Sequence, residues 1–217
     1  WVNAAASGVE IVDDWDGMGQ RLTASGTVTF DGTRIDESLV LTTDDDEDRP
    51  YNYTGAHAQI IFCAIYIGIA RAALNEGIEY IETKARPWIH SGVSKASDDP
   101  HVVHRVGAMD IAIDAAEATL DRAADSLQHG RSTLDPEDCR AAQVAVSRAK
   151  AVCTEAVLKV TEEIFQVCGT SSARRQTNLD RHWRNARTLT LHDPVDYKYK
   201  MVGEARFGIP PTISAWS

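Results

Sequence analysis

The chain has little cysteine and no excess of positive charge. Its four cysteines, Cys63, Cys139, Cys153 and Cys168, have neither CxxC nor metal-ligand spacing. This argues against a thiol redox motif and a structural zinc site, so we expect no metal and read the cysteines as reduced, buried thiols of a cytoplasmic protein. Lysine and arginine number 22 against 32 acidic residues, a net charge of -10. Such a balance argues against nucleic acid as a partner.

Long hydrophobic runs are also lacking. The most apolar stretch, residues 60–73, is interrupted by Gly68 and Arg71, and it is shorter than the roughly 20 residues that a membrane-spanning helix needs. We therefore expect no membrane association. No signal peptide is evident at the start. Because residue 1 is Trp rather than Met, we expect the chain to be part of a longer polypeptide.

The first 52 residues differ in pattern from the rest. Residues 9–12 and 23–30 are rich in β-branched side chains or alternate in polarity, with glycines as turns between them. The acidic run at residues 44–48 is typical of a solvated linker. The pattern predicts β structure followed by a linker over residues 1–52.

From residue 53 onward the apolar residues recur with helical spacing. Long helices are predicted over residues 55–85, 100–128 and 135–167, with shorter ones over about 179–192 and 195–205 and an irregular arm after them. Asp99-Pro100 and Asp135-Pro136 are typical helix starts, because aspartate caps free backbone N–H groups and proline suits the first turn. The sequence predicts a mainly α fold, with residues 53–217 forming an antiparallel helical bundle and a terminal arm.

The densest chemistry lies at residues 181–194, Arg-His-Trp-Arg-Asn-Ala-Arg-Thr-Leu-Thr-Leu-His-Asp-Pro. Helical spacing predicts that Trp183 and Ala186 share one face and that His192 and Asp193 sit at the helix end, before Pro194. Histidine titrates near neutral pH, and a neighbouring carboxylate can orient the ring or hold a proton. The pair is therefore a candidate for acid–base chemistry, and a solvated basic helix with a capping aspartate is the alternative.

A second candidate is the turn Gly169-Thr170-Ser171-Ser172 between two predicted helices. A glycine turn rich in backbone and hydroxyl donors can hold an anion. A plain helix C-cap explains the same residues equally well.

Two stretches carry a family resemblance. One is residues 15–30, Trp-Asp-Gly-Met-Gly-Gln-Arg-Leu-Thr-Ala-Ser-Gly-Thr-Val-Thr-Phe, and the other is the run from Asp180 to Pro194 with its His-Asp-Pro ending. A β element followed by such a bundle resembles the acyl-CoA dehydrogenase fold. The ending is similar to one branch of that superfamily, the two-component flavin-dependent monooxygenases of the dibenzothiophene monooxygenase kind.

The resemblance covers nearly the whole chain and implies the end of a middle β domain in residues 1–52 and the C-terminal helical domain in residues 53–217. It implies a homotetramer that uses reduced FMN from a separate flavin reductase, with FAD as the alternative. The implied reaction is oxidation of a small hydrophobic or organosulfur compound by O2 through a flavin peroxide adduct.

Matched to this family, Arg86 falls where an arginine reaches the flavin phosphate of an adjacent subunit. Gly169, Thr170, Ser171 and Ser172 fall on the turn that lines the flavin. His192 and Asp193 fall beside the place of the dehydrogenases' glutamate base, and the resemblance implies that His192 supports the flavin–oxygen adduct. Leu189 stands where relatives often carry a second histidine, so a mechanism with two histidines does not fit this sequence.

Two other functions stay open at the level of sequence. One is an acyl-CoA dehydrogenase with Asp193 as its base, although aspartate is one methylene shorter than glutamate and is followed here by a rigid proline. The other is a non-catalytic assembly module, because half of the flavin site expected from the resemblance has no counterpart in this chain.

Overall fold

A computed structural model describes residues 2–40 and 53–209. Its β part is a two-stranded antiparallel sheet of β1 (Val9–Ile11) and β2 (Val28–Phe30), with Val9 opposite Phe30. The strand expected over residues 23–30 forms only at its end. Gln20 and Ala24 have left-handed backbone conformations, which turn the chain before the strand can begin. The acidic run at 44–48 lies outside the described residues.

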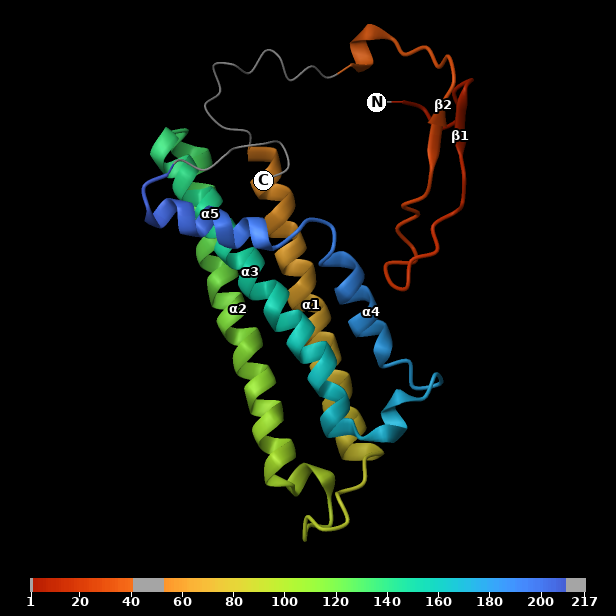
Figure 1. Cartoon of the computed structure of the whole chain (residues 1–217), viewed down its shortest axis with the longest axis vertical. Helices are drawn as coiled ribbons and strands as arrows, with labels where there is room; N and C mark the ends of the chain where they lie inside the picture. The colour runs from red at the N-terminus through yellow and green to blue at the C-terminus, as the bar shows by residue number, and fades with distance from the viewer. Residues whose placement is uncertain (1, 41–52, 210–217) are drawn as a thin grey trace.

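Three long helices make the body of the molecule. They are α1 (Tyr53–Thr83), α2 (Pro100–Thr133) and α3 (Pro136–Cys168), and α2 runs antiparallel to both α1 and α3 (Figure 1). The mainly α bundle predicted from the sequence is confirmed. Both predicted caps form, since Asp99 accepts a hydrogen bond from His101 N at 2.8 Å and Asp135 accepts one from Glu137 N at 2.8 Å.

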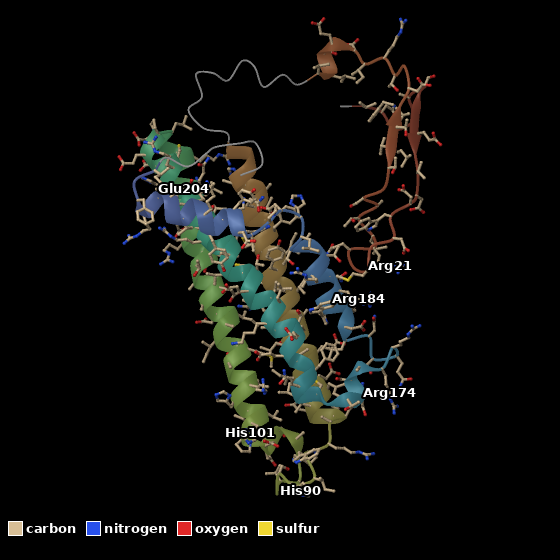
Figure 2. All side chains as sticks on the ribbon, viewed as in Figure 1. Arg21, His90, His101, Arg174, Arg184 and Glu204 are labelled. Carbon is tan, nitrogen blue, oxygen red and sulfur yellow. The ribbon has the colours of Figure 1, made fainter. Side chains whose placement is uncertain are left out.

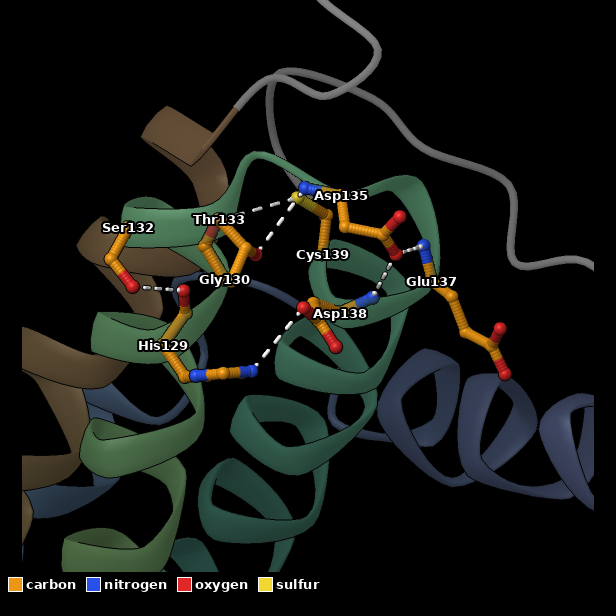
Figure 3. A network of polar contacts seen from close by, with 8 residues as sticks. All are labelled: His129, Gly130, Ser132, Thr133, Asp135, Glu137, Asp138 and Cys139. Atoms are coloured by element: carbon orange, nitrogen blue, oxygen red, sulfur yellow. Dashed lines mark hydrogen bonds and ion pairs between the residues drawn. The ribbon is translucent and has the colours of Figure 1, made fainter.

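The turn between α2 and α3 reverses the chain within two residues (Figure 3). Leu134 takes a left-handed conformation with φ 54° and caps α2, while the side chain of Asp135 caps α3. Across the turn, His129 Nε2 lies 3.2 Å from Asp138 Oδ2, and Ser132 Oγ donates to the His129 carbonyl at 2.7 Å. These local contacts set the two helices side by side.

Helix α3 is the centre of the bundle, because α1, α2, α4 and α5 all pack on it. Its buried residues Val157, Val160 and Ile164 meet Tyr66 of α1 and Met109 of α2 in one core cluster. None of the four cysteines forms a disulfide, and all four are buried, as predicted. Among the described residues, no group of three or more histidine, cysteine or acidic side chains could hold a metal ion.

Helix α1 corrects the expectation that its apolar stretch is too short to span a membrane. Its portion Gly55–Thr83 is long and apolar enough to cross a membrane by length and composition alone. This is weak evidence for a membrane span, because core helices of soluble proteins pass the same test. Here Cys63, Tyr66 and Ala70 are buried in the bundle, while Ile61 and Ile65 are exposed on its outer face.

Two shorter helices complete the described chain. The 3-10 turn η4 (Thr170–Ala173) follows α3, then α4 (Asp180–Leu189) packs on α1 and α3, and α5 (Asp196–Arg206) crosses the bundle near the start of α3 (Figure 1). On α4 the buried residues are His182 and Ala186, whereas Trp183 is only partly buried. The buried face of α4 is therefore the one that carries His182 and Ala186.

Candidate active site

His192 and Asp193 lie in the turn that joins α4 to α5. Helix α4 ends at Leu189, and the backbone N–H of His192 donates to the Leu189 carbonyl at 3.1 Å. Pro194 then prevents the helix from continuing. The two residues are thus just beyond the helix end where the sequence predicted them, in a tight turn that fixes their backbone.

The carboxylate of Asp193 sits between two buried lysines. Lys150 Nζ of α3 is 3.2 Å from Oδ1, and Lys198 Nζ of α5 is 3.2 Å from Oδ2. Burial opposes ionisation of Asp193, but the positive charges of Lys150 and Lys198 outweigh it and hold the pKa of the carboxyl below its usual value. Asp193 is therefore a paired anion whose two oxygens both face cations.

Lys150 also connects this turn to α1. Its Nζ donates to Tyr66 Oη at 2.9 Å, and Tyr66 Oη donates in turn to the Leu189 carbonyl at 3.2 Å. The ammonium lies 4.7 Å from the centre of the Phe62 ring and 4.8 Å from that of Tyr66, within range of a cation–π attraction. Burial lowers the pKa of Lys150, and the charge of Asp193 acts in the opposite direction.

His192 is the more accessible member of the pair. Its Nδ1 lies 3.6 Å from Asp193 Oδ1, and its ring centre is 4.4 Å from that of Phe62. The side chain is 46% exposed, against 18% for Asp193. The imidazole thus packs beside Phe62 with Nδ1 towards Asp193, and nearly half of its side chain stays accessible to a bound molecule.

A second group of predicted residues meets at the C-terminal end of α3. Arg86, Gly169 and Thr170 line a hollow of about 620 Å³ together with His90 and His101. Figure 2 labels these two histidines at this end of the bundle. The hollow lies where α1 and α3 end and α2 begins. It combines the guanidinium groups of Arg86 and Arg105 with two imidazoles, and these donors outnumber its one carboxylate, Asp99, so the lining suits an anion.

The other two residues of the predicted turn do not line this hollow. Ser172 is 1% exposed, and its Oγ donates to the Gly169 carbonyl at 2.7 Å. Ser171 is exposed to solvent and does not line the hollow. Gly169 has φ 74°, which an L side chain rarely adopts, and it caps α3. The turn therefore acts as a helix cap and also presents Gly169 and Thr170 to the hollow.

The sequence reasoning missed the residues that surround Asp193. Lys150 stands four residues after Val146 and seven before Val157, so it occupies a core position on the buried face of α3. A lysine within an apolar helical stripe is the signal that could have drawn attention to it, since buried lysines need a partner. Lys198 gave no comparable signal, because α5 is short and mixed in polarity.

Helix α4 is anchored by charged contacts to α1. Glu76 accepts from Arg181 Nη1 at 3.0 Å and lies 2.8 Å from Nε2 of the buried His182. The hydrogen bond from Arg181 lowers the pKa of Glu76. On its other side, α4 contacts the β segment, because Asn185 Oδ1 accepts from Gln20 N at 2.8 Å. The helix that leads to His192 is thus held from two sides.

Comparisons with known proteins agree with this architecture. Residues 60–197 match the family model described as acyl-CoA dehydrogenase, C-terminal domain. The chain is 37% identical to a dibenzothiophene monooxygenase of Mycolicibacterium goodii over 94% of this chain and 52% of that protein. It is 30% identical to a probable FMNH2-dependent monooxygenase, SfnC, of Pseudomonas putida, again over 94% and 52%.

Solved structures are similar over the whole chain. The dibenzothiophene monooxygenase TdsC of Paenibacillus sp. A11-2 superposes with a TM-score of 0.91 at 35% identity, covering 100% of this chain and 57% of that one. The methanesulfinate monooxygenase MsuC of Pseudomonas fluorescens gives 0.94 at 32% identity with the same coverage. The chain spans about half the length of the curated relatives it matches. By fold and by sequence, it belongs to the family of the acyl-CoA dehydrogenase C-terminal domain.

Proposed function

We propose that this chain is the helical part of a flavin-dependent monooxygenase that uses reduced FMN and O2 to oxidise a small organosulfur or hydrophobic compound. The peroxide route expected from the resemblance belongs to this proposal, as does the division into the end of a β domain at 1–52 and the bundle at 53–217. Its support is the similarity to monooxygenases named for dibenzothiophene and methanesulfinate, together with the chemistry of the turn after α4.

The observation that carries the reaction type is the pairing of Asp193. A dehydrogenase needs a carboxylate that is free to take a proton from carbon. Asp193 instead faces Lys150 and Lys198, each at 3.2 Å, and its lowered pKa makes it a weaker base than an ordinary carboxylate. The geometry therefore favours the oxygenase over the acyl-CoA dehydrogenase.

The residues present fit an FMN phosphate. The hollow at the end of α3 offers the guanidinium of Arg86, the hydroxyl of Thr170 and the backbone of Gly169, whose lack of a side chain leaves open space beside it. Guanidinium groups bind phosphate by paired hydrogen bonds. When bound, reduced FMN supplies the electrons that activate O2 for transfer of one oxygen atom. FAD is the alternative cofactor, and its second phosphate would need further donors.

His192 is the group that we assign to proton control. Its Nδ1 faces Asp193, so the protonated ring, which carries a hydrogen on both nitrogens, can donate a hydrogen bond from Nε2 to the oxygen being transferred. Phe62 covers the ring and keeps water from one face. The neighbouring Leu189 is partly buried and packs against the core, so it adds apolar surface beside this turn. An apolar surrounding limits the loss of oxygen as hydrogen peroxide.

The assembly is part of the same proposal. Arg86 lies beside Gly169 at the C-terminal end of α3, whereas Asp193, next to His192, contacts Lys150 near the middle of that helix. We propose that one flavin spanning a subunit boundary uses each of these two regions from a different copy. The exposed Ile61 and Ile65 on α1 offer an apolar face for such contacts. We propose a homotetramer in the cytoplasm, supplied with reduced FMN by a separate reductase, and sedimentation would test the oligomer.

The proposed reaction is tested in the polypeptide that contains this chain. Chemically reduced FMN, ¹⁸O2 and a panel of thiophenes and alkanesulfinates are supplied, and ¹⁸O in the product is measured. Incorporation of one ¹⁸O atom is the expected result. Reduction of a dye by acyl-CoA without reductase would instead establish a dehydrogenase. Absence of both activities and of flavin binding would establish an assembly module.

A further inference from the structure

The cluster around Asp193 holds more positive than negative charge. The side chains of Lys150 and Lys198 are 1% and 5% exposed, and both face the same carboxylate, which is 18% exposed. Burying an ammonium group is unfavourable unless an opposite charge is close. One lysine would be enough to neutralise Asp193. The second makes the carboxylate a fixed anion that is held from two helices at once.

The surroundings of Asp193 contain few other charges. The titratable groups that face it from each packed element are Tyr66 and Cys63 of α1, Lys150 of α3, Lys198 of α5 and His192 of its own turn. Among these, only the two lysines and a protonated His192 carry positive charge. The ionisation of Asp193 therefore depends on the lysines, and the contact with His192 depends on Asp193.

We propose that Lys150 and Lys198 are positioning residues for His192: they keep the Asp193 carboxylate ionised and directed at Nδ1 of the imidazole, which leaves Nε2 to face the reacting oxygen. The orientation of a histidine ring, and which nitrogen carries the proton, are set by the partner of the other nitrogen. An anionic Asp193 at 3.6 Å favours the proton on Nδ1. The role of Nε2 rests on the proposed function.

A second contact chain fixes the backbone of the same turn. Lys150 donates to Tyr66, and Tyr66 donates to the carbonyl of Leu189, the last residue of α4. The same carbonyl accepts from the backbone N–H of His192 at 3.1 Å. Lys150 thus holds both the carboxylate beside the imidazole and the backbone that carries it. A lysine that served packing alone would need neither contact.

The test compares two lysines on one helix. Lys198→Met removes a buried charge at Asp193 and keeps an apolar side chain of similar length. Lys200→Met is the matched control, because Lys200 is exposed and pairs with Glu204. Lys150→Met repeats the test from α3. NMR of ¹³C-labelled aspartate, assigned with Asp193→Asn, follows the carboxyl, and ¹⁵N-labelled histidine reports the protonated nitrogen of His192.

In the parent protein and in Lys200→Met, Asp193 should stay ionised from about pH 5 to pH 8, with the proton of the neutral ring on Nδ1. In Lys198→Met and Lys150→Met the midpoint of Asp193 should rise by about 1 to 3 pH units, as expected for loss of an adjacent opposite charge. As Asp193 gains its proton, the Nδ1 preference should fall. An unchanged titration and tautomer in folded Lys198→Met, or an equal shift in Lys200→Met, would overturn the proposal.

The NMR readout needs neither flavin nor substrate. If the titration shifts as expected while no oxygen is incorporated by the parent protein, the positioning role stands and the proposed function fails. If oxygen is incorporated and the titration does not shift, the proposed function stands and the positioning role fails.

Discussion

The contact between α1 and α3 makes a sharp prediction at Gly77. A Cβ atom at this position would lie 2.0 Å from Ile164 Cδ1 and 2.3 Å from Ile164 Cγ1. Ile164 is fully buried, so it has little space to move aside. By contrast, a Cβ at Gly107, inside α2, would meet nothing within 4 Å. The two glycines therefore separate the effect of helix propensity from that of packing.

Alanine is favoured over glycine inside a helix by about 1 kcal/mol, whereas overpacking a core costs typically about 1–3 kcal/mol. Gly107→Ala should raise the free energy of unfolding by up to about 1 kcal/mol. The free energy of unfolding of Gly77→Ala should be lower than that of Gly107→Ala by about 1–3 kcal/mol. Urea denaturation followed by far-ultraviolet circular dichroism, at one protein concentration, measures both. Equal stabilisation by the two alanines would refute the close packing of α1 on α3.

Three further predictions concern the site and its supports. Arg86→Ala should weaken FMN binding by about 1.5–3 kcal/mol in a fluorescence titration, as for loss of a hydrogen bond to a charged group, with Arg86→Lys intermediate; unchanged affinity would remove Arg86 from the site. Arg181 lowers the pKa of Glu76, so its stabilising effect should be complete above the ordinary carboxyl value of about 4.3 and should disappear as pH falls through the lowered one. Glu76→Gln should therefore flatten the acid side of the stability profile, and a profile parallel to the parent would count against the contact. Tyr66→Phe should cost about 1–2 kcal/mol of stability by urea denaturation, because it leaves the Leu189 carbonyl without its side-chain donor; a neutral result would show that the bond is unimportant.

The helical bundle could be predicted because local signals agreed with the apolar pattern. Asp99 and Asp135 each precede a proline, and both cap helices as expected. The length of the strand after Gln20 was overestimated. The backbone N–H of Gln20 donates to Asn185, 165 residues away, and this contact competes with the local preference for β structure. Tertiary contacts of this kind leave no trace in a window of neighbouring residues.

The candidate site could be predicted only in part. His192 and Asp193 were visible because they follow a helix and precede a proline. The environment of Asp193 was not, because Lys150 and Lys198 stand 43 residues before it and five after it, and only the packing of α3 and α5 brings them together. Arg86 lines the same hollow as Gly169 and Thr170, and the roles of these residues stay predictions.

The most direct test of the central claim is the coupling of oxygen transfer in His192→Ala. The polypeptide containing this chain is supplied with reduced FMN and substrate, and product and hydrogen peroxide are measured per flavin oxidised. His129→Ala, which removes an exposed histidine near the C-terminal end of α2, is the control. His192→Ala should bind FMN normally yet lose about 10²-fold in coupled turnover and release peroxide, as for loss of one placed donor. Coupling equal to that of the parent and of His129→Ala would contradict the assignment of His192.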